Sequence, residues 1–455
     1  MTRPNAVPAA RISRRRVIGS VPALAGAGAL GVAAAGCGIG QPSTPSQTPV
    51  TVRALLDPSL IALFGETAPV IPTFKSANPN VTLDIEAGPG PSEGNLAMIS
   101  KFKAKIASGE QLDVYGNAAS DTVAGFAKAG LLRDLGSMMA KQRAVQTKDY
   151  WSAAVGAVTY SGKLYALPFQ VFTQLLYYNE DLLKREGQPL PTKDWTWDKV
   201  LEVSKAVTRP ASGNQPGQWG INMVFTGIRP GGLIFMWDWG GKLFDDDMNP
   251  KTLSLDPNGA AGWQWMADMF IKHRVVPLAT DATAAGFANA SAMVNAGQVA
   301  FNFSSLTWRS YRNNTGFKAD VQMLPKGPAR QTAATWADCL TMPTVAKSPD
   351  AALNLMTHIS GPAGQKLMIP VVDQFPSVES IATSSEWLKF DQFNRQAAVD
   401  MIKLARPIPP TPAWPEINTG VLGPLGGEVV SGRKTATQAL QEVKSKVDDL
   451  LRTLG

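Results

Sequence analysis

Apolar and polar residues follow two recurring periods along the first third of the chain. The apolar run at residues 50–56 and the every-second-residue alternation at 81–86 are typical of strands. Residues 95–107 repeat their apolar positions at helical spacing, and a short strand at 112–115 and a helix at 120–130 follow. This succession predicts an α/β lobe built on a parallel or mixed sheet.

The same alternation continues to the end of the chain. A second set of elements runs from about 175 to 320, and a last helix is expected over 435–454. Thr435, followed three residues later by Gln438, predicts a capping box at the start of that helix. At 455 residues the chain is long enough for two or three compact units.

Residues 1–36 indicate an export signal. Three consecutive arginines at 14–16 precede an uncharged run of mostly small residues that ends in AAGC at 34–37. The pattern resembles a bacterial lipoprotein signal with a twin-arginine start, which implies cleavage before Cys37 and a lipid on its sulfur. Pro22 and the weakly apolar Gly and Ala content favour this interpretation over a transmembrane helix, and both the twin-arginine and the general export routes are compatible with it. Residues 37–49, rich in Gly, Pro, Ser and Thr, are expected to form a flexible tether.

Composition and charge argue against several classes of function. The chain is 44% hydrophobic and 17% charged, as in ordinary globular proteins, with a net charge of +7. Five arginines within residues 1–36 account for five of these charges, and no basic stripe interleaved with aromatics follows, so we expect no nucleic-acid binding. Two cysteines and two histidines are too few for a zinc site of the common Cys/His type or for a disulfide scaffold, and we expect no metal and no cofactor. Cys339 is expected to be a small buried residue.

Several short motifs occur in a fixed order along the body of the chain. They are FKSANPNV at 74–81, ASGEQLDV at 107–114, GKLYALP at 162–168, GGKLFD at 240–245 and AGQVAF at 296–301. In this order and spacing the chain resembles the family-1 extracellular solute-binding proteins of bacterial ABC importers, the maltose-binding-protein-like group. The resemblance covers nearly all of residues 50–455.

This resemblance implies a fold and a division of the chain. The expected fold class is α/β, a two-lobed periplasmic-binding-protein fold of type II, with mixed sheets flanked by helices and a ligand cleft between the lobes. Lobe 1 is expected to comprise 50–172 and 322–372, and lobe 2 to comprise 173–321 and 373–455. The lobes are expected to close on the ligand by a hinge motion.

The resemblance also implies a role. We expect a monomer that is anchored by its lipid to the outer face of the cell membrane. It would capture a carbohydrate (an oligosaccharide, an amino sugar or a polyol), deliver it to the ABC permease subunits and catalyse nothing.

Aromatic candidates follow from the chemistry of sugars, whose C–H faces stack on aromatic rings. Six of the twelve tryptophans lie in patterns that predict packing: Trp151, Trp195, Trp197, Trp263, Trp265 and Trp387. Four others lie in loop-like segments beside small or polar residues: Trp237, Trp308, Trp336 and Trp414. The resemblance implies ring contacts at Trp237, Trp308 and Trp414, whereas Trp336 lies where the family often has two glycines and so adds a side chain there. For each of these four, core packing is the alternative interpretation.

Polar candidates follow from sugar hydroxyls, which donate to carboxylates and amides. They lie at the ends of expected strands or near the expected crossover: Asp57, Asn117, Asp121, Gln170 and Asp338, with Phe172 at a position where the family has an acidic contact. A helix cap or a turn is the alternative role for each polar residue.

Some features of the sequence bear on functions other than sugar binding. Arg309 and Arg312 next to Trp308 would suit a phosphate, so a binder of a glycerophosphodiester or phosphorylated sugar is the main alternative. A peptide or polyamine binder fits the resemblance less well. An exported carbohydrate-active enzyme would need two opposed carboxylates, and the acidic run at 245–247 is instead expected to be a solvated loop.

Overall fold

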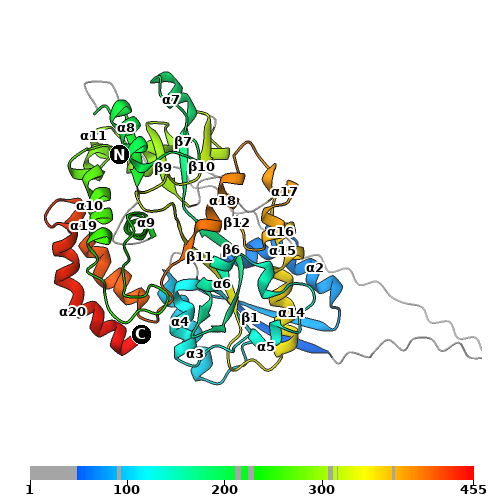
Figure 1. Cartoon of the computed structure of the whole chain (residues 1–455). Helices are drawn as coiled ribbons and strands as arrows, with labels where there is room; N and C mark the ends of the chain where they lie inside the picture. The colour runs from blue at the N-terminus through cyan, green and yellow to red at the C-terminus, as the bar shows by residue number, and fades with distance from the viewer. Residues whose placement is uncertain are drawn as a thin grey trace, which may run out of the picture. The chain divides into compact units, whose positions relative to one another are not determined.

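The computed structural model describes residues 49–89, 94–210, 217–223, 230–305, 311–314, 316–370 and 375–455. Two mixed sheets, each flanked by helices, organise these residues (Figure 1). The export segment with Cys37, and residues 306–310 with Trp308 and Arg309, lie outside the described residues.

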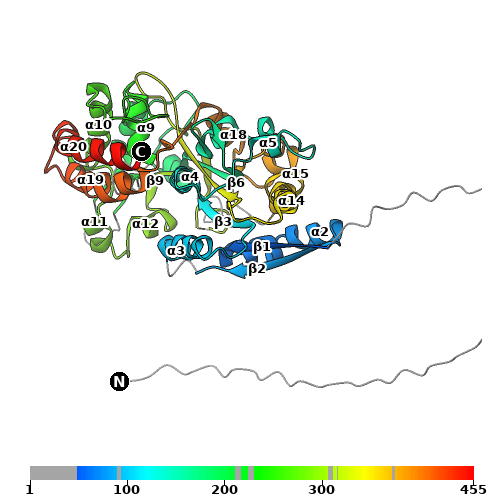
Figure 2. The ribbon, with the colours of Figure 1, turned by 90° about the horizontal axis from the view of Figure 1, so that it is seen from below.

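The first sheet has seven strands in the order β12-β6-β11-β3-β1-β2, with β13 pairing to β11. Their bounds are β1 Val50–Leu56, β2 Val81–Ala87, β3 Val114–Ala119, β6 Ala166–Thr173, β11 Ala334–Thr341, β12 Phe375–Pro376 and β13 Arg406–Pro407. β1 runs parallel to β2 and β3, whereas β11 runs antiparallel to β3 and β6. Figure 2 shows β3, β1 and β2 following one another toward one edge of this sheet.

The second sheet has four strands in the order β10-β7-β9-β8. Their bounds are β7 Leu175–Asn179, β8 Trp219–Met223, β9 Val299–Ser304 and β10 Ala319–Gln322. β8 and β9 are parallel, and β7 is antiparallel to β9 and β10. A separate hairpin joins β4 Thr159–Tyr160 to β5 Lys163–Leu164.

Helices accompany both sheets. In the chain segments around the first sheet they are α1 Pro58–Ile61, α2 Val70–Ala77, α3 Gly94–Ala107, α4 Ser120–Lys128, α5 Gly136–Met139, α6 Ser152–Ala157, α14 Pro349–Ser360, α15 Pro362–Met368, α16 Glu379–Ala382 and α17 Ser385–Leu388. In the segments around the second sheet they are α7 Glu180–Arg185, α8 Trp197–Val207, α9 Pro230–Asp238, α10 Pro257–Ile271, α11 Ala279–Ala284, α12 Ala290–Asn295, α18 Gln396–Leu404, α19 Gly423–Val430 and α20 Ala436–Leu454. α19 and α20 pack against α10 (Figure 1).

Local sequence patterns account for several of these elements. β1 and β2 have the predicted bounds to within a residue, and Thr435 caps the start of α20 with the predicted capping box to Gln438. The strand expected at 112–115 instead runs from 114 to 119. Asp113 precedes it, and its buried carboxylate accepts the backbone N–H groups of Arg53, Lys347 and Ser348 at 2.8–2.9 Å.

Two of the segments in which the chain passes between the sheets are hydrogen-bonded to each other. β6 ends at Thr173 and β7 begins at Leu175, so Gln174 alone joins them. The Gln174 side-chain oxygen accepts the N–H of Ala334, the first residue of β11, at 3.2 Å. Next to it, the Thr335 hydroxyl donates to the backbone oxygen of Phe172 at 2.8 Å. The crossover from β6 and the return from β10 are therefore bonded to each other.

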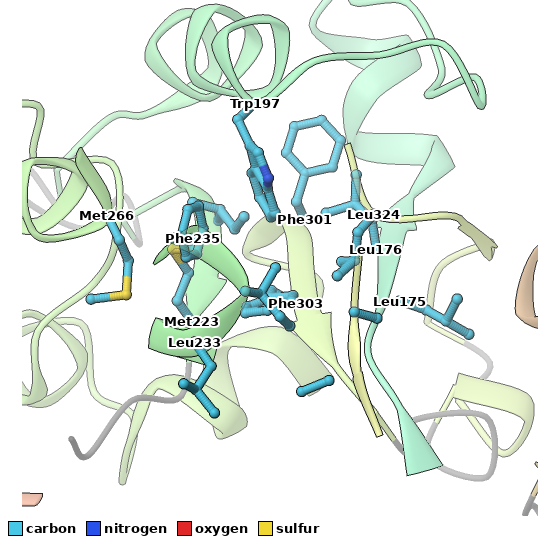
Figure 3. Close-up of a cluster of buried hydrophobic side chains, with 14 of the residues drawn as sticks. Leu175, Leu176, Trp197, Met223, Leu233, Phe235, Met266, Phe301, Phe303 and Leu324 are labelled. Carbon is cyan, nitrogen blue, oxygen red and sulfur yellow. The ribbon is translucent and has the colours of Figure 1, made fainter. Parts of the chain in front are cut away.

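Two cores lie on either side of these crossovers. One gathers around β1, β3 and β6, and the other around α8, α9, α10 and the second sheet. Figure 3 shows Trp197, Phe235 and Phe303 converging in the second core. Of the six tryptophans predicted to pack, five are buried and Trp265 is partly buried, which confirms that prediction. Cys339 is fully buried, also as predicted.

The prediction for the acidic run was wrong for one of its three members. Asp247 is buried, because it accepts the indole N–H of Trp237 at 2.7 Å and the backbone N–H of Phe244 at 2.9 Å. Asp245 and Asp246 are exposed. The run is thus a turn held in place by one internal carboxylate.

A buried acid ties the second core to the return crossover. Asp238, at the end of α9, accepts the indole N–H of Trp197 at 3.0 Å, and its backbone oxygen accepts the N–H of Ala329 at 2.9 Å. A Cβ on Gly327 would lie 2.5 Å from Asp238, so only glycine allows this approach. Burial raises the pKa of the Asp238 carboxyl to about 8.

We expect the Asp238→Asn variant to lose a specific pH dependence of stability. The folded pKa lies above the unfolded value of about 3.9, so native Asp238 keeps a proton that the unfolded chain releases. The free energy of unfolding of the wild type should therefore fall by up to about 1.4 kcal/mol per pH unit as the pH rises from about 5 to 8. Urea unfolding across this range should show a flatter slope for the variant, and equal slopes would contradict the assignment.

Candidate functional site

Two of the predicted carboxylates lie at one edge of the first sheet. Asp57 follows β1 directly and caps α1 by accepting the N–H of Ser59 at 2.8 Å. Asp121 lies in the first turn of α4, directly after β3. Because β1 and β3 are parallel, their carboxyl ends meet at the same edge, where open α/β sheets bind ligands.

The pairing of β6 with β11 brings four more predicted residues together. Trp336 lies opposite Phe172, and Asp338 lies opposite Gln170, so all four side chains share one face of the sheet. The rings of Phe172 and Trp336 stack with centroids 5.2 Å apart and planes inclined by 3°. The Gln170 side-chain amide donates to the Asp338 carboxylate.

Electrostatics connect these two groups of residues. Burial raises the pKa of the Asp338 carboxyl to about 6, against the opposing effect of the hydrogen bond from Gln170. The negative charges of Asp121 and Asp57 raise this pKa further. The charges of Asp57 and Asp121 therefore act on Asp338, and we call these three residues the carboxylate cluster.

Two positioning contacts were not anticipated from the sequence. The buried Ser120 hydroxyl, at the start of α4, accepts the N–H of Ala337 at 3.0 Å and so holds Asp121 beside β11. In the second sheet the buried amides of Asn222 and Asn302 are bonded at 2.8 Å, near the carboxyl ends of parallel strands β8 and β9. A single asparagine inside an apolar strand was the available signal for each member of this pair.

Two predicted aromatic residues lie elsewhere. Trp237 is 0% exposed, with its N–H on Asp247 and the Arg406 guanidinium 4.7 Å from its ring centroid. Trp414 is 1% exposed and packs edge-on against Phe244. Both rings belong to the second core and are not grouped with the carboxylate cluster.

The remaining predicted residues, Asn117 and Arg312, are not grouped with the carboxylate cluster. Asn117 lies within β3 rather than after it, and its side chain is outside the described part of the structure. Arg312 forms an ion pair with Asp391 at 3.8 Å and lies over the Phe390 ring. Asp391 also binds the buried Arg395, so Arg312 takes part in an ionic network of the fold.

The described residues contain neither a candidate metal site nor a candidate membrane-spanning helix. Within them, no group of three or more His, Cys, Asp or Glu side chains is arranged to hold a metal ion. No helix in the described ranges combines the length and the apolar character needed to cross a membrane.

Comparisons with known proteins agree on one family and one fold. Residues 70–393, more than half of the chain, match the family described as bacterial extracellular solute-binding protein. A probable ABC transporter-binding protein of Deinococcus radiodurans is 25% identical over 258 residues, 54% of this chain and 59% of that protein. The galactooligosaccharide-binding protein of Bacillus subtilis is 23% identical over 302 residues, 64% of this chain and 67% of that protein.

Solved structures show a likeness in fold over most of the chain. The sugar-binding protein MalE from Xanthomonas citri superposes with a TM-score of 0.74 over 88% of this chain and 97% of that one, at 20% identity. This likeness confirms the two-lobed α/β fold with mixed sheets that the sequence predicts. The alignment to the Deinococcus protein spans about three fifths of that protein's length.

The Trp237–Asp247 pair provides a test of the packing role. Trp237→Phe keeps an aromatic ring but removes the indole N–H, and Asp247→Ala removes the carboxylate that accepts this N–H and pairs with Arg406. We expect a double-mutant cycle to give a coupling of about 1–2 kcal/mol in the free energy of unfolding. Additive effects of the two substitutions would show that the hydrogen bond does not stabilise the fold.

Proposed function

The chain belongs to the family of bacterial extracellular solute-binding proteins, and we propose that it captures a carbohydrate for an ABC importer and passes it to the permease. The observation that carries this proposal is the grouping of the Phe172–Trp336 stack with Gln170 and the carboxylate cluster. An aromatic face covers the C–H surface of a sugar ring, and carboxylates accept its hydroxyl protons. The aromatic stack and the carboxylates both lie at the same edge of the first sheet.

The relatives support the ligand class. The Bacillus subtilis relative is named for galactooligosaccharides, and the similar Xanthomonas citri structure is named as a sugar-binding protein. We therefore assign this chain an oligosaccharide, amino sugar or polyol as ligand. Asn222 and Asn302 lie at the matching strand ends of the second sheet, where a ligand held on the first sheet would meet the other lobe.

Capture is proposed to proceed by hinge closure between a lobe built on the first sheet and a lobe built on the second. The proposed ranges are 50–172 with 322–372 and 173–321 with 373–455, except that β12 and β13 pair in the first sheet. The ligand binds the first lobe, and its contacts with the second lobe select the closed state. Gln174 and Thr335 hold the crossovers beside the site, so closure occurs next to the bound ligand.

The proposed role involves no catalysis. A glycosidase places two carboxylates on opposite sides of the bond that it cleaves. Asp57, Asp121 and Asp338 instead come from neighbouring strand ends of a single sheet. This arrangement suits hydrogen bonding to one side of a ligand.

The alternative ligand, a glycerophosphodiester or phosphorylated sugar, is less favoured by the charges. The carboxylate cluster would repel a phosphate, and Arg312 is engaged with Asp391. A thermal-shift panel of neutral sugars, amino sugars, polyols and glycerophosphodiesters distinguishes the two proposals. A shift with sugars or polyols supports carbohydrate capture, and a shift with phosphodiesters alone would replace it.

We expect Trp336→Leu to weaken the binding of whichever carbohydrate the panel identifies. Loss of ring stacking should lower the affinity by about tenfold, on the order of 1–1.5 kcal/mol, in calorimetric titration. Trp239→Leu is the matched control, since Trp239 is also a half-buried tryptophan but packs on Phe235 and Trp265 in the second core. Equal losses in both variants would argue against a ligand contact at Trp336.

Export and anchoring form a separate part of the proposal. Cleavage before Cys37 and lipidation of its sulfur would hold the mature protein, a monomer, on the outer face of the membrane near its permease. We expect Cys37→Ser to shift the protein from the membrane fraction to the soluble fraction and to remove the lipid mass in intact mass spectrometry. An unchanged membrane fraction would contradict the anchor.

A further inference from the structure

A small internal cavity borders the candidate site. Its walls include the apolar side chains of Phe169, Met368, Ile369 and Phe375, each of which is no more than 8% exposed. Gln170, a residue of the candidate site, lines the same cavity. The cavity volume is about 20 Å³. One water molecule needs roughly 10–15 Å³ on this measure, so the space suits a single group about as large as a methyl.

The Gln170 amide has one atom bonded and one atom open. Its nitrogen donates to the Asp338 carboxylate. Its Oε1 is buried and has no hydrogen-bond donor among the described residues, and the residue as a whole is 4% exposed. Buried polar atoms in native proteins nearly always have a partner, because an unmet one costs free energy. The oxygen is thus the atom to which a donor at the cavity would bind.

A water molecule alone is a poor occupant of this space, since a buried water usually makes about three hydrogen bonds. Gln365, the other amide in the wall, is already engaged. Its nitrogen donates to the backbone oxygen of Ser360 and to the Ser377 hydroxyl. Its oxygen accepts the N–H of Val378 at 3.0 Å. The cavity therefore favours an apolar group with one hydrogen-bond donor beside it.

An N-acetyl group combines these two properties. Its amide is planar and trans, which places the N–H and the methyl on the same edge of the group. The N–H can therefore donate to Gln170 while the methyl enters the cavity. A hydroxyl provides the donor without the methyl, and a protonated amine brings a charge that apolar walls disfavour.

We infer that Gln170 and the cavity beside it form a subsite for an N-acetyl group, so that the carbohydrate is an N-acetylated amino sugar. The inference rests on the proposed function, because it names the class of sugar that the same site takes. The Phe172–Trp336 stack lies two residues farther along the same pair of strands. Two strand residues span about 7 Å, so the stack is placed to contact the sugar ring while the N-acetyl group reaches Gln170.

The test compares sugars that differ in one group. Glucose, glucosamine, N-acetylglucosamine and N-butanoylglucosamine, and the corresponding galactose series, are titrated calorimetrically into the mature protein. We expect the N-acetyl sugar to bind about tenfold more tightly than its hydroxyl and amine counterparts, because it adds a buried methyl and a hydrogen bond to an atom that lacks one. The butanoyl group is two methylenes longer and should lose this advantage, because the cavity has no room for it.

Two variants assign the preference to the cavity, and the readout for each is a ratio of affinities within one series. Met368→Ala enlarges the cavity and should shift the preference from the acetyl to the butanoyl sugar. Gln170→Met removes the acceptor and should reduce the ratio of N-acetyl to hydroxyl affinities.

Met356→Ala is the matched control. Met356 is a 0% exposed methionine of α14 in the same core as Met368, but it is not among the residues that line the cavity. Its truncation should therefore leave both ratios unchanged. Thermal unfolding establishes that each variant is folded before titration, and Ile369→Ala, which enlarges the same cavity, replaces Met368→Ala if that variant does not fold.

Failure has two distinct forms. The N-acetyl subsite is overturned, and carbohydrate capture stands, if hydroxyl or amine sugars bind as tightly as N-acetyl sugars, if another carbohydrate binds but neither series does, or if the cavity variant and Met356→Ala change the acyl preference equally. If no carbohydrate of the thermal-shift panel or of the two series binds at all, the proposed function itself falls, and the subsite with it.

Discussion

The antiparallel pairing of β6 with β11 is the interaction on which the rest of the structure depends. It joins residues about 160 positions apart in the sequence, and it sets Phe172 against Trp336 and Gln170 against Asp338. The same two strands run directly into the crossovers, where Gln174 binds Ala334 and Thr335 binds Phe172. A shift of one strand by one residue would turn its two site residues to the other face, away from their partners, and would break the hydrogen bonds between the crossovers.

In the proposed function, this arrangement would place recognition and conformational change in one pair of strands. The polar and aromatic contacts lie on β6 and β11, within a few residues of the crossovers to the second sheet. On the far side of the crossover, Asp238 and Gly327 fix the return segment to the second core. The moving boundary is therefore short, with well-packed structure on both sides of it.

Local sequence patterns were sufficient for some of these features. β1, β2 and the capped last helix could be predicted because period and capping depend on neighbouring residues. Asp57 and Asp121 could be grouped because parallel strands end at one edge. The Phe172–Trp336 stack could not, since it requires the register of two distant strands. Trp237 and Trp336 look alike in sequence, and it is the buried Asp247 that commits Trp237 to the core.

The single-residue link between β6 and β7 has a mechanical consequence. A connection of one residue permits rotation about its backbone torsions but almost no sliding, so the two bodies that it joins form a lever with its fulcrum at Gln174. Atoms are displaced in proportion to their distance from a fulcrum. In the proposed hinge closure, small adjustments around a ligand held a few residues from Gln174 would thus be amplified at the outer rims, and those rims would be the surfaces most able to report occupancy to a partner.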